Sequence, residues 1–321
     1  MKNQLAKKLN IFIVLIVVLI GGIFVYYFFI KNGNKDLIST KNAFSEDLVF
    51  KEDNTTVPEW ITNDPMLPDN GPWYDSLYIS ISEDGLNFSN ERLFLPHSGV
   101  GNIMLTSDGI LISIFQYFSY SNQELFDVIA YVTSEDFGKT WSSVKALNIS
   151  GLSNSTACDP TLVQLPDNTL RLYFTYHKPG EQYPQLYSAI STDIDGTFKI
   201  EGKQLETEEI ILDPAVVYFD GKWHHYTVKH GDSFDSTASN VHSVSDSGVS
   251  FKLRSDIDIN FQMLGDVIVV DDMLRFYNGR ESAISDDGYL WEKEPGIRLD
   301  GADPGVVQLP DESYIAIYTK P

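Results

Sequence analysis

Four aspartates stand at matching places in four similar stretches of the chain, each at the entrance to an apolar run with the composition of a β-strand. If those strands gather around one axis, the four carboxylates meet and repel one another. At least one of them is then expected to have a raised pKa, which prepares a carboxyl group for acid–base chemistry. These candidate catalytic residues are Asp159, Asp213, Asp266 and Asp303.

Four further candidates stand where the next strand of these stretches should end. An antiparallel strand returns to the face where its predecessor began, so these side chains should surround the same funnel as the aspartates. Carboxylates about 6.5–9.5 Å apart can serve as acid and base in inverting glycoside hydrolysis. The predicted substrate-binding residues at this funnel are His177, His230, Arg280 and Glu281.

Each candidate also has a structural interpretation. An aspartate before a proline at a strand entrance can simply cap the preceding loop, and its repetition in several units favours such a habit. Arg280 and Glu281 can form a salt bridge that supports the funnel, or Arg280 can anchor an anionic group. The spacings resemble no metal-binding motif, so we predict neither a metal nor another cofactor.

Short strands in repeated units must position these residues. The unit at 213–251 contains the strands AVVYF, WHHYTVKH and NVHSVS, joined by a turn at Asp220-Gly221 and a polar loop. Similar units begin near residues 98, 159, 265 and 303. Repeats of this length, each a small meander of strands, predict a β-propeller.

A second marker follows the third strand of each unit: a serine, an acid, a glycine and then an aromatic residue. Its best copies lie at 134–141 and 285–291, and looser copies begin at 82, 191 and 245. The acid can accept hydrogen bonds from backbone amides across a tight turn, and glycine supplies a positive φ. These turn markers resemble Asp-boxes, and we interpret them as structural features of the face opposite the funnel.

The inner strands and the turn markers are out of phase. The domain opens with a third and fourth strand at 74–96 and ends with a first and second strand at 303–320. The two halves complement one another, so a fifth blade built from both ends would close the ring and remove an exposed sheet edge. The predicted fold is therefore an all-β, five-bladed β-propeller over residues 73–321.

The N-terminal region carries a different signal. Residues 11–30 form an uninterrupted run of apolar residues and glycines, about the ~20 residues that a helix needs to cross a bilayer. The run follows three lysines and lacks a small-residue cleavage site. We predict a cytoplasmic N-terminus at 1–10, an uncleaved transmembrane anchor at 11–30, a linker at 31–72 and an extracytoplasmic propeller.

Part of that linker is expected to lie against the domain as an extended segment, because it holds six proline, tryptophan and methionine residues within a short stretch. These are Pro58, Trp60, Pro65, Met66, Pro68 and Trp73.

Composition excludes some functions. The net charge of −22 argues against nucleic-acid binding, which needs a basic surface. Cys158 is the only cysteine, so no intrachain disulfide can form, and we interpret it as a buried, inert thiol.

The segments DPAVVYFDGKWHHYTV at 213–228 and AISDDGYLW at 283–291 together resemble the five-bladed glycoside hydrolase superfamily of arabinanases, β-xylosidases, levansucrases and invertases. The resemblance implies that one aspartate acts as base or nucleophile, that another tunes a pKa and orients the sugar, and that a glutamate is the general acid. The four aspartates match the acidic inner-strand starts of that superfamily. The first unit has Gly99-Val100-Gly101-Asn102 where an acid is expected, and no inner strand begins with glutamate, which leaves Glu281 as a substitute.

Two functions remain open. One is a membrane-anchored, extracytoplasmic glycoside hydrolase that acts on a carbohydrate or glycoconjugate through the funnel carboxylates. The alternative is a non-catalytic propeller that binds a glycan or a protein at the same face. The turn markers also resemble those of sialidases, but sialidases have six blades and a triad of arginines, so sialidase activity is less expected.

Overall fold

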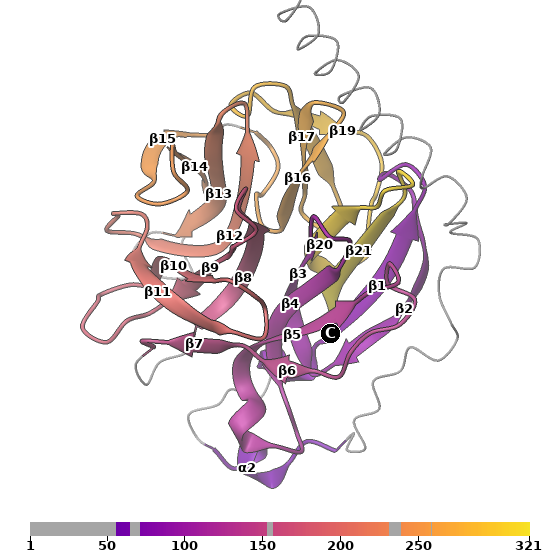
Figure 1. The fold of residues 1–321 in the computed structure, drawn as a ribbon, viewed down its shortest axis with the longest axis vertical. Helices are drawn as coiled ribbons and strands as arrows, with labels where there is room; N and C mark the ends of the chain where they lie inside the picture. The colour runs from indigo at the N-terminus through magenta and orange to yellow at the C-terminus, as the bar shows by residue number, and fades with distance from the viewer. Residues whose placement is uncertain (1–55, 65–70, 153–156, 231–238, 258) are drawn as a thin grey trace, which may run out of the picture. The chain divides into compact units, whose positions relative to one another are not determined.

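Antiparallel β-strands make up most of the computed structural model, which describes residues 56–64, 71–152, 157–230, 239–257 and 259–321 (Figure 1). The remaining described elements are three short helical turns, α2 (Glu59–Thr62), η2 (Pro72–Tyr74) and η3 (Gln123–Leu125). The predicted anchor at 11–30 lies outside the described residues. Within the described residues, no helix is long and apolar enough to span a membrane.

The strands form five sheets, and each sheet is called a blade here. Blade 1 contains β3 (Ser98–Leu105), β4 (Leu111–Phe118), β5 (Phe126–Ser134) and β6 (Lys145–Ala146). Blade 2 contains β8 (Ala157–Gln164), β9 (Leu170–Tyr176), β10 (Gln185–Ser191) and β11 (Thr197–Lys203), with β7 (Asn148–Ser150) beside β11. Blade 3 contains β12 (Ile210–Phe219), β13 (Lys222–His230), β14 (Ser239–Ser245) and β15 (Lys252–Asp256). Blade 4 contains β16 (Asp266–Val270), β17 (Met273–Tyr277), β18 (Ser282–Ser285) and β19 (Glu292–Glu294).

Blade 5 joins the two ends of the domain. Its strands are, from the inside outward, β20 (Ala302–Gln308), β21 (Tyr314–Lys320), β1 (Ser76–Ser82) and β2 (Phe88–Pro96). Strands β1 and β21 pair along their whole length, from Ser76 opposite Lys320 to Ser82 opposite Tyr314. This pairing confirms the predicted closure and leaves neither terminal strand as a free sheet edge.

The innermost strands form a closed ring. Strand β3 contacts β8, β8 contacts β12, β12 contacts β16, β16 contacts β20, and β20 returns to β3. Figure 1 shows these strands toward the centre of the blades, with β2, β11 and β15 on the outside. The predicted five-bladed β-propeller is therefore confirmed. Each inner strand starts at one face, called the funnel face, and ends at the other, called the turn face.

The turn markers fasten successive blades together. In blades 2, 3 and 4, a buried tyrosine of the second strand donates a hydrogen bond to a glycine carbonyl in the turn marker of the next blade. The pairs are Tyr173 with Gly248 (2.6 Å), Tyr226 with Gly288 (2.8 Å) and Tyr277 with Gly85 (3.0 Å). All three glycines have positive φ, and a serine hydroxyl accepts each glycine N–H. The markers thus support the fold at the turn face, as the sequence predicted.

We expect Tyr226→Phe to destabilise the propeller by about 1–3 kcal/mol, because it leaves the buried Gly288 carbonyl without its donor. Urea unfolding followed by tryptophan fluorescence measures the change. The matched control is Tyr74→Phe, whose side chain is 41% exposed, and it should alter the free energy of unfolding by less than about 0.5 kcal/mol. Equal stability of the two variants would contradict a fastening role for Tyr226.

The segment at 56–64 lies against blade 1, but it is not extended throughout. Residues 59–62 form the helix α2, which buries Ile61 beside Trp73. Trp60 meets Phe126 edge-on, with ring centroids 4.8 Å apart. The predicted contact with the domain is therefore correct for these residues, and the predicted extended conformation is wrong for 59–62. The rest of the predicted segment, Pro65, Met66 and Pro68, lies outside the described residues.

Candidate active site

Three of the four predicted aspartates occupy the same β-bulge in their blades. The strand pairing shifts between Cys158 and Thr161, between Leu212 and Ala215, and between Ala302 and Gly305. Within these bulges, Asp159, Asp213 and Asp303 have φ values of 51°, 51° and 46°. Aspartate tolerates this left-handed conformation better than most residues, and the proline that follows each one has no N–H to contribute to the ladder.

Blade 1 has the same bulge without the acid. Its pairing shifts between Gly99 and Asn102, and Val100 adopts the left-handed φ of 49°. A β-branched residue rarely adopts this conformation, so the bulge is imposed by the blade rather than by the side chain. The structure therefore places Val100 where the other blades present a carboxylate.

The three bulge aspartates line one axial cavity together with Val100. Its volume is about 20 Å³, which is enough for one water molecule and too small for a sugar ring. A larger space of about 570 Å³ continues along the axis, and Asn102 and Thr161 line both. A glycan in contact with the aspartates must therefore bind on the outer, funnel side of the cavity, with room for water between the carboxylates.

Among the described hydrogen bonds, Asp159 has more protein donors at its carboxylate than Asp213 or Asp303 has. Its Oδ2 atom lies 3.4 Å from the backbone N of Asp213 and 3.5 Å from the Cys158 thiol, and the Thr175 hydroxyl also donates to it. Burial raises the pKa of Asp159, and these hydrogen bonds oppose the shift because they favour the charged form.

The surroundings of Asp213, by contrast, only disfavour the charged form of its carboxyl group. Burial raises its pKa well above the ordinary range, and the negative charges of Asp159 and Asp303 raise it further. Asp303 is intermediate, because burial and the charges of Asp159 and Asp75 raise its pKa to about 6. The site thus combines a carboxyl group whose pKa is raised by burial and by two like charges with one in which hydrogen bonds oppose the effect of burial, and such different environments favour acid–base catalysis.

Asp266 lies in a different register from the other three. It begins β16 and pairs with Tyr277. The matching positions in blades 2 and 3 are Thr161, which pairs with Tyr173, and Ala215, which pairs with Tyr226. Both of those residues lie two positions after the bulge aspartate of their blade. Its carboxylate accepts hydrogen bonds from the backbone N–H groups of Val267 and Val306, each at 2.9 Å.

This arrangement ties blade 4 to blade 5. Asn102 does the same in blade 1, where its Oδ1 atom accepts from the Leu162 N–H of blade 2 at 3.1 Å. Burial raises the pKa of Asp266 to about 7, against the effect of its two backbone donors. Asp266 lines the larger axial space and not the cavity of the bulge aspartates.

The four predicted substrate-binding residues lie at the funnel-face ends of their strands, and none of them lines the described part of the axial cavity. His177 is exposed, and its Nε2 atom lies 3.0 Å from the Glu181 carbonyl oxygen. His230 ends β13 opposite Ile210. Arg280 is exposed between β17 and β18. Glu281 pairs with Lys293, so the salt bridge weighed for Arg280 and Glu281 is absent from the described ion pairs.

Two further acids at the funnel face escaped the sequence prediction. Asp75 precedes β1 and is half-buried; burial raises its pKa, and its charge acts on Asp303. Asp127 is the second residue of β5, has a φ of 61° and accepts a hydrogen bond from Gln116 at 2.5 Å. Both stand at the start of a third strand, which begins at the funnel face just as an inner strand does. Because third strands begin at the funnel face, a search of their first residues for acids could have identified Asp75 and Asp127 from the sequence.

Cys158 lies beside the site rather than in it. Burial raises the pKa of its thiol well above the usual range, and neighbouring carboxylates add to the shift. A thiol that stays protonated is a poor nucleophile, which agrees with the predicted inert role. Among the described residues, no group of three or more His, Cys, Asp or Glu side chains has the geometry of a metal site.

No protein-family model and no curated protein sequence matches this chain. Solved structures do match its fold. A thermostable family-43 glycoside hydrolase superposes with a TM-score of 0.51 at 12% identity, over 69% of this chain and 88% of that one. The α-L-arabinofuranosidase Arb93A of Fusarium graminearum gives 0.50 at 16% identity, over 68% and 74%.

A protein of unknown function from Dyadobacter fermentans gives a TM-score of 0.53 at 13% identity, over 81% of this chain and 88% of that one. At these identities the likeness establishes the fold alone. The resemblance to propeller glycoside hydrolases that the sequence motifs indicated is thus confirmed at the level of the five-bladed fold.

Proposed function

We propose that this chain is a glycoside hydrolase that cleaves a glycan bound at the funnel face, over the axial cavity. The observation that carries the proposal is the convergence of Asp159, Asp213 and Asp303 from three blades on one water-sized cavity. Carboxyl groups that face one cavity, in environments that shift their pKa values by different causes, are the kind of residue that glycoside hydrolysis uses. The glycoside hydrolases of the same fold support the proposal by analogy.

The electrostatics of the cavity suggest the roles. Asp213 keeps its proton because burial and two neighbouring charges disfavour ionisation, so it acts as the general acid toward the leaving-group oxygen. Asp159 is the base, because burial raises its pKa but three hydrogen-bond donors oppose that shift and favour the carboxylate, and it activates the attacking water. Asp303 keeps the pKa of Asp213 raised. In this scheme an aspartate takes the place of the glutamate that the resemblance implies.

Loss of the Asp303 charge should shift the pH dependence of turnover. The charge of Asp303 raises the pKa of Asp213, so Asp303→Asn lowers it, and Asp213 then loses its proton at a lower pH. The basic limb of the kcat/KM profile is therefore expected to move to lower pH in the variant. Steady-state kinetics from pH 4 to 9 measure the shift, and a basic limb that moves upward or stays in place would contradict the assignment.

The alternative is a propeller that binds a glycan without cleaving it. Val100 favours it, because blade 1 presents a methyl-bearing side chain at the bulge where three other blades present a carboxylate. A glycan array run beside a panel of chromogenic glycosides separates the two functions. Release of chromophore supports the hydrolase, whereas array binding with no release from any substrate supports the binding protein.

We also propose that residues 11–30 anchor the chain in a membrane with the propeller outside the cytoplasm. The support is the apolar run itself and the lysines before it. Expression in cells followed by carbonate extraction tests the anchor, and protease treatment of intact spheroplasts tests the orientation. Release of the full-length chain by carbonate would refute the anchor.

A further inference from the structure

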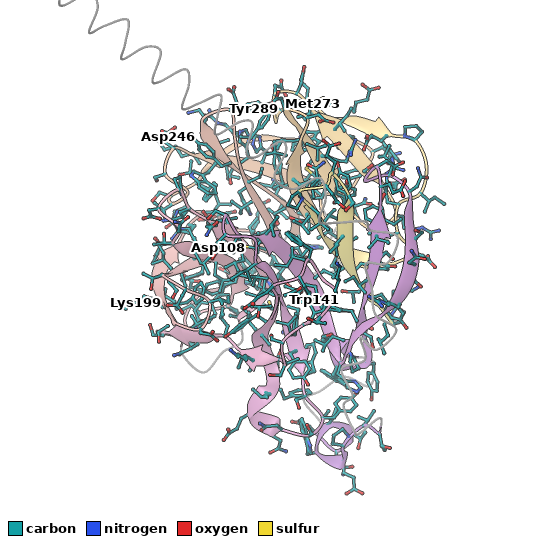
Figure 2. The ribbon with its side chains drawn as sticks, turned by 45° about the vertical axis from the view of Figure 1, so that its right-hand side comes forward. Asp108, Trp141, Lys199, Asp246, Met273 and Tyr289 are labelled. Atoms are coloured by element: carbon teal, nitrogen blue, oxygen red, sulfur yellow. The ribbon has the colours of Figure 1, made fainter. Side chains whose placement is uncertain are left out.

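The turn face carries a hollow that the proposed hydrolysis does not use. It has a volume of about 760 Å³ and lies between blades 2 and 3, lined by the end of β12, the turn after β8 and the turn marker after β14. Asp246, labelled in Figure 2, belongs to that marker. The hollow is called the turn-face groove here. A groove of this volume accommodates a ligand of several sugar units.

An aromatic side chain stands open to solvent in the groove. Tyr218, near the end of β12, is 53% exposed, although most of the large aromatic side chains in this fold are buried. Its ring lies 5.3 Å from that of Trp223, which is itself only 7% exposed and is held in the core between blades 2 and 3. The Tyr218 ring therefore packs against a buried ring that restricts its movement, and its exposed surface is of the kind on which the apolar face of a sugar stacks.

The charges around the groove disfavour an anionic ligand. Arg171 is the one cation among the described residues that line the groove, and it binds Glu201 at 2.8 and 3.0 Å. Beside the groove, Lys222 binds Asp246 at 2.7 Å, and the charges of Lys252 and Arg254 also act on Asp246. The exposed acid Asp167 adds negative charge to the rim, whereas the charge of Asp246 is balanced by Lys222. A neutral ligand that offers hydroxyl groups fits this surface, because carboxylates accept hydrogen bonds from hydroxyls and repel phosphate, sulfate or uronate groups.

The groove also continues into a neighbouring hollow. A second space of about 370 Å³ lies between blades 1 and 2, and Ser107, Gln164 and Asn168 line both. Ser107 donates from its N–H to Gln164 Oε1 at 2.7 Å and from its hydroxyl to Asn168 Oδ1 at 3.0 Å. These bonds use the amide oxygens, and within the part of the chain that the structure describes the amide N–H groups of Gln164 and Asn168 can donate to a ligand. The combined length suits a chain of sugars rather than a single one.

From this combination we infer that the turn-face groove is a second carbohydrate-binding site, which holds a neutral glycan chain on Tyr218. The site is separate from the proposed active site. Tyr218 lies five residues after Asp213 on β12, toward the turn face, which places it about 16 Å away at ~3.3 Å per residue. A glycan held there would keep the funnel of the same molecule close to its polymer without passing through the axial cavity.

Native affinity electrophoresis of the full-length chain in detergent tests this inference. The gels contain arabinan, xylan or β-1,3-galactan as neutral polysaccharides, or polygalacturonate as an anionic one. We expect at least one neutral polysaccharide to retard the wild type. Tyr218→Ala should weaken that retardation at least tenfold, whereas Tyr218→Phe, which keeps the ring, should stay within about twofold of the wild type.

The matched control is Leu290→Ala, which removes a 76% exposed apolar side chain from another turn marker, outside the groove, and should migrate as the wild type does. Undiminished retardation of Tyr218→Ala, retardation by polygalacturonate alone, or no retardation by any neutral polysaccharide would each overturn the inference. Retardation needs no turnover, so a chain that hydrolyses nothing can still pass this test. Conversely, a chain that cleaves aryl glycosides but is not retarded loses only the second site.

Discussion

Asp213→Asn is expected to reduce the turnover of a natural glycan by about 10²–10⁴-fold, because the variant has no acidic proton to transfer to the leaving-group oxygen. The loss should depend on the leaving group. A dinitrophenyl glycoside departs without protonation, so the variant should cleave it far more nearly at the wild-type rate. Steady-state kinetics on the two substrates, with the same enzyme preparation, measure the contrast.

The same variant should fold at least as well as the wild type. The pKa of Asp213 is raised in the folded state above its unfolded value near 3.8, so the folded chain binds the extra proton over that interval. Stability conferred by the wild-type side chain is then full below the unfolded pKa and falls as pH rises through the folded pKa. Asparagine has no such dependence, and Asp213→Asn should match or exceed the wild-type melting temperature at pH 8.

These two readouts separate catalysis from folding. A stable variant with full turnover of the natural glycan would remove Asp213 from the mechanism. A variant that melts well below the wild type would instead assign the carboxyl group a structural role in the bulge, where a proline follows it.

The sequence was sufficient for the blades because each one repeats a local signal. Turn residues at regular spacing, alternating with apolar runs, determine where strands begin and end, and the half-blades at the two ends can pair only with each other. The register of each inner strand was harder to predict from the sequence. Asp266 precedes an apolar strand, as the other three aspartates do, but its place is set by pairing with Tyr277 across the ladder. The residue after it offered a clue, since proline follows the three bulge aspartates and Val267 follows Asp266.

The residues at the rim of the funnel face were predicted less completely than the aspartates that line the axial cavity. His177, Arg280 and Glu281 lie in connections, whose side-chain partners depend on neighbouring loops rather than on the repeat. Asp75 stands just before a third strand and Asp127 near the start of another. Closure of the ring brings the charge of Asp75 near Asp303, and the packing of blade 1 on blade 2 brings that of Asp127 near Cys158. Long-range electrostatics of this kind cannot be inferred from spacing along the chain.

Asp159→Ala is the second variant with a large expected effect, about 10²–10⁴-fold on every glycoside, because it removes the carboxylate that activates the nucleophilic water. A good leaving group cannot compensate for a missing base, so the dinitrophenyl glycoside should lose as much activity as the natural glycan. This response is the opposite of that expected for Asp213→Asn, and it distinguishes the two roles within one experiment.

Removal of the Asp159 side chain also enlarges a cavity that holds about one water molecule, which leaves space for a small anion in its place. Azide or formate at high concentration should therefore restore turnover of the dinitrophenyl glycoside by Asp159→Ala, with an azide adduct or a formate-dependent rate as the readout. The matched control is Val100→Ala, which enlarges the same cavity without removing an acid and should show no dependence on either anion. Equal stimulation of the two variants would attribute the rescue to cavity size alone and remove Asp159 from the role of base.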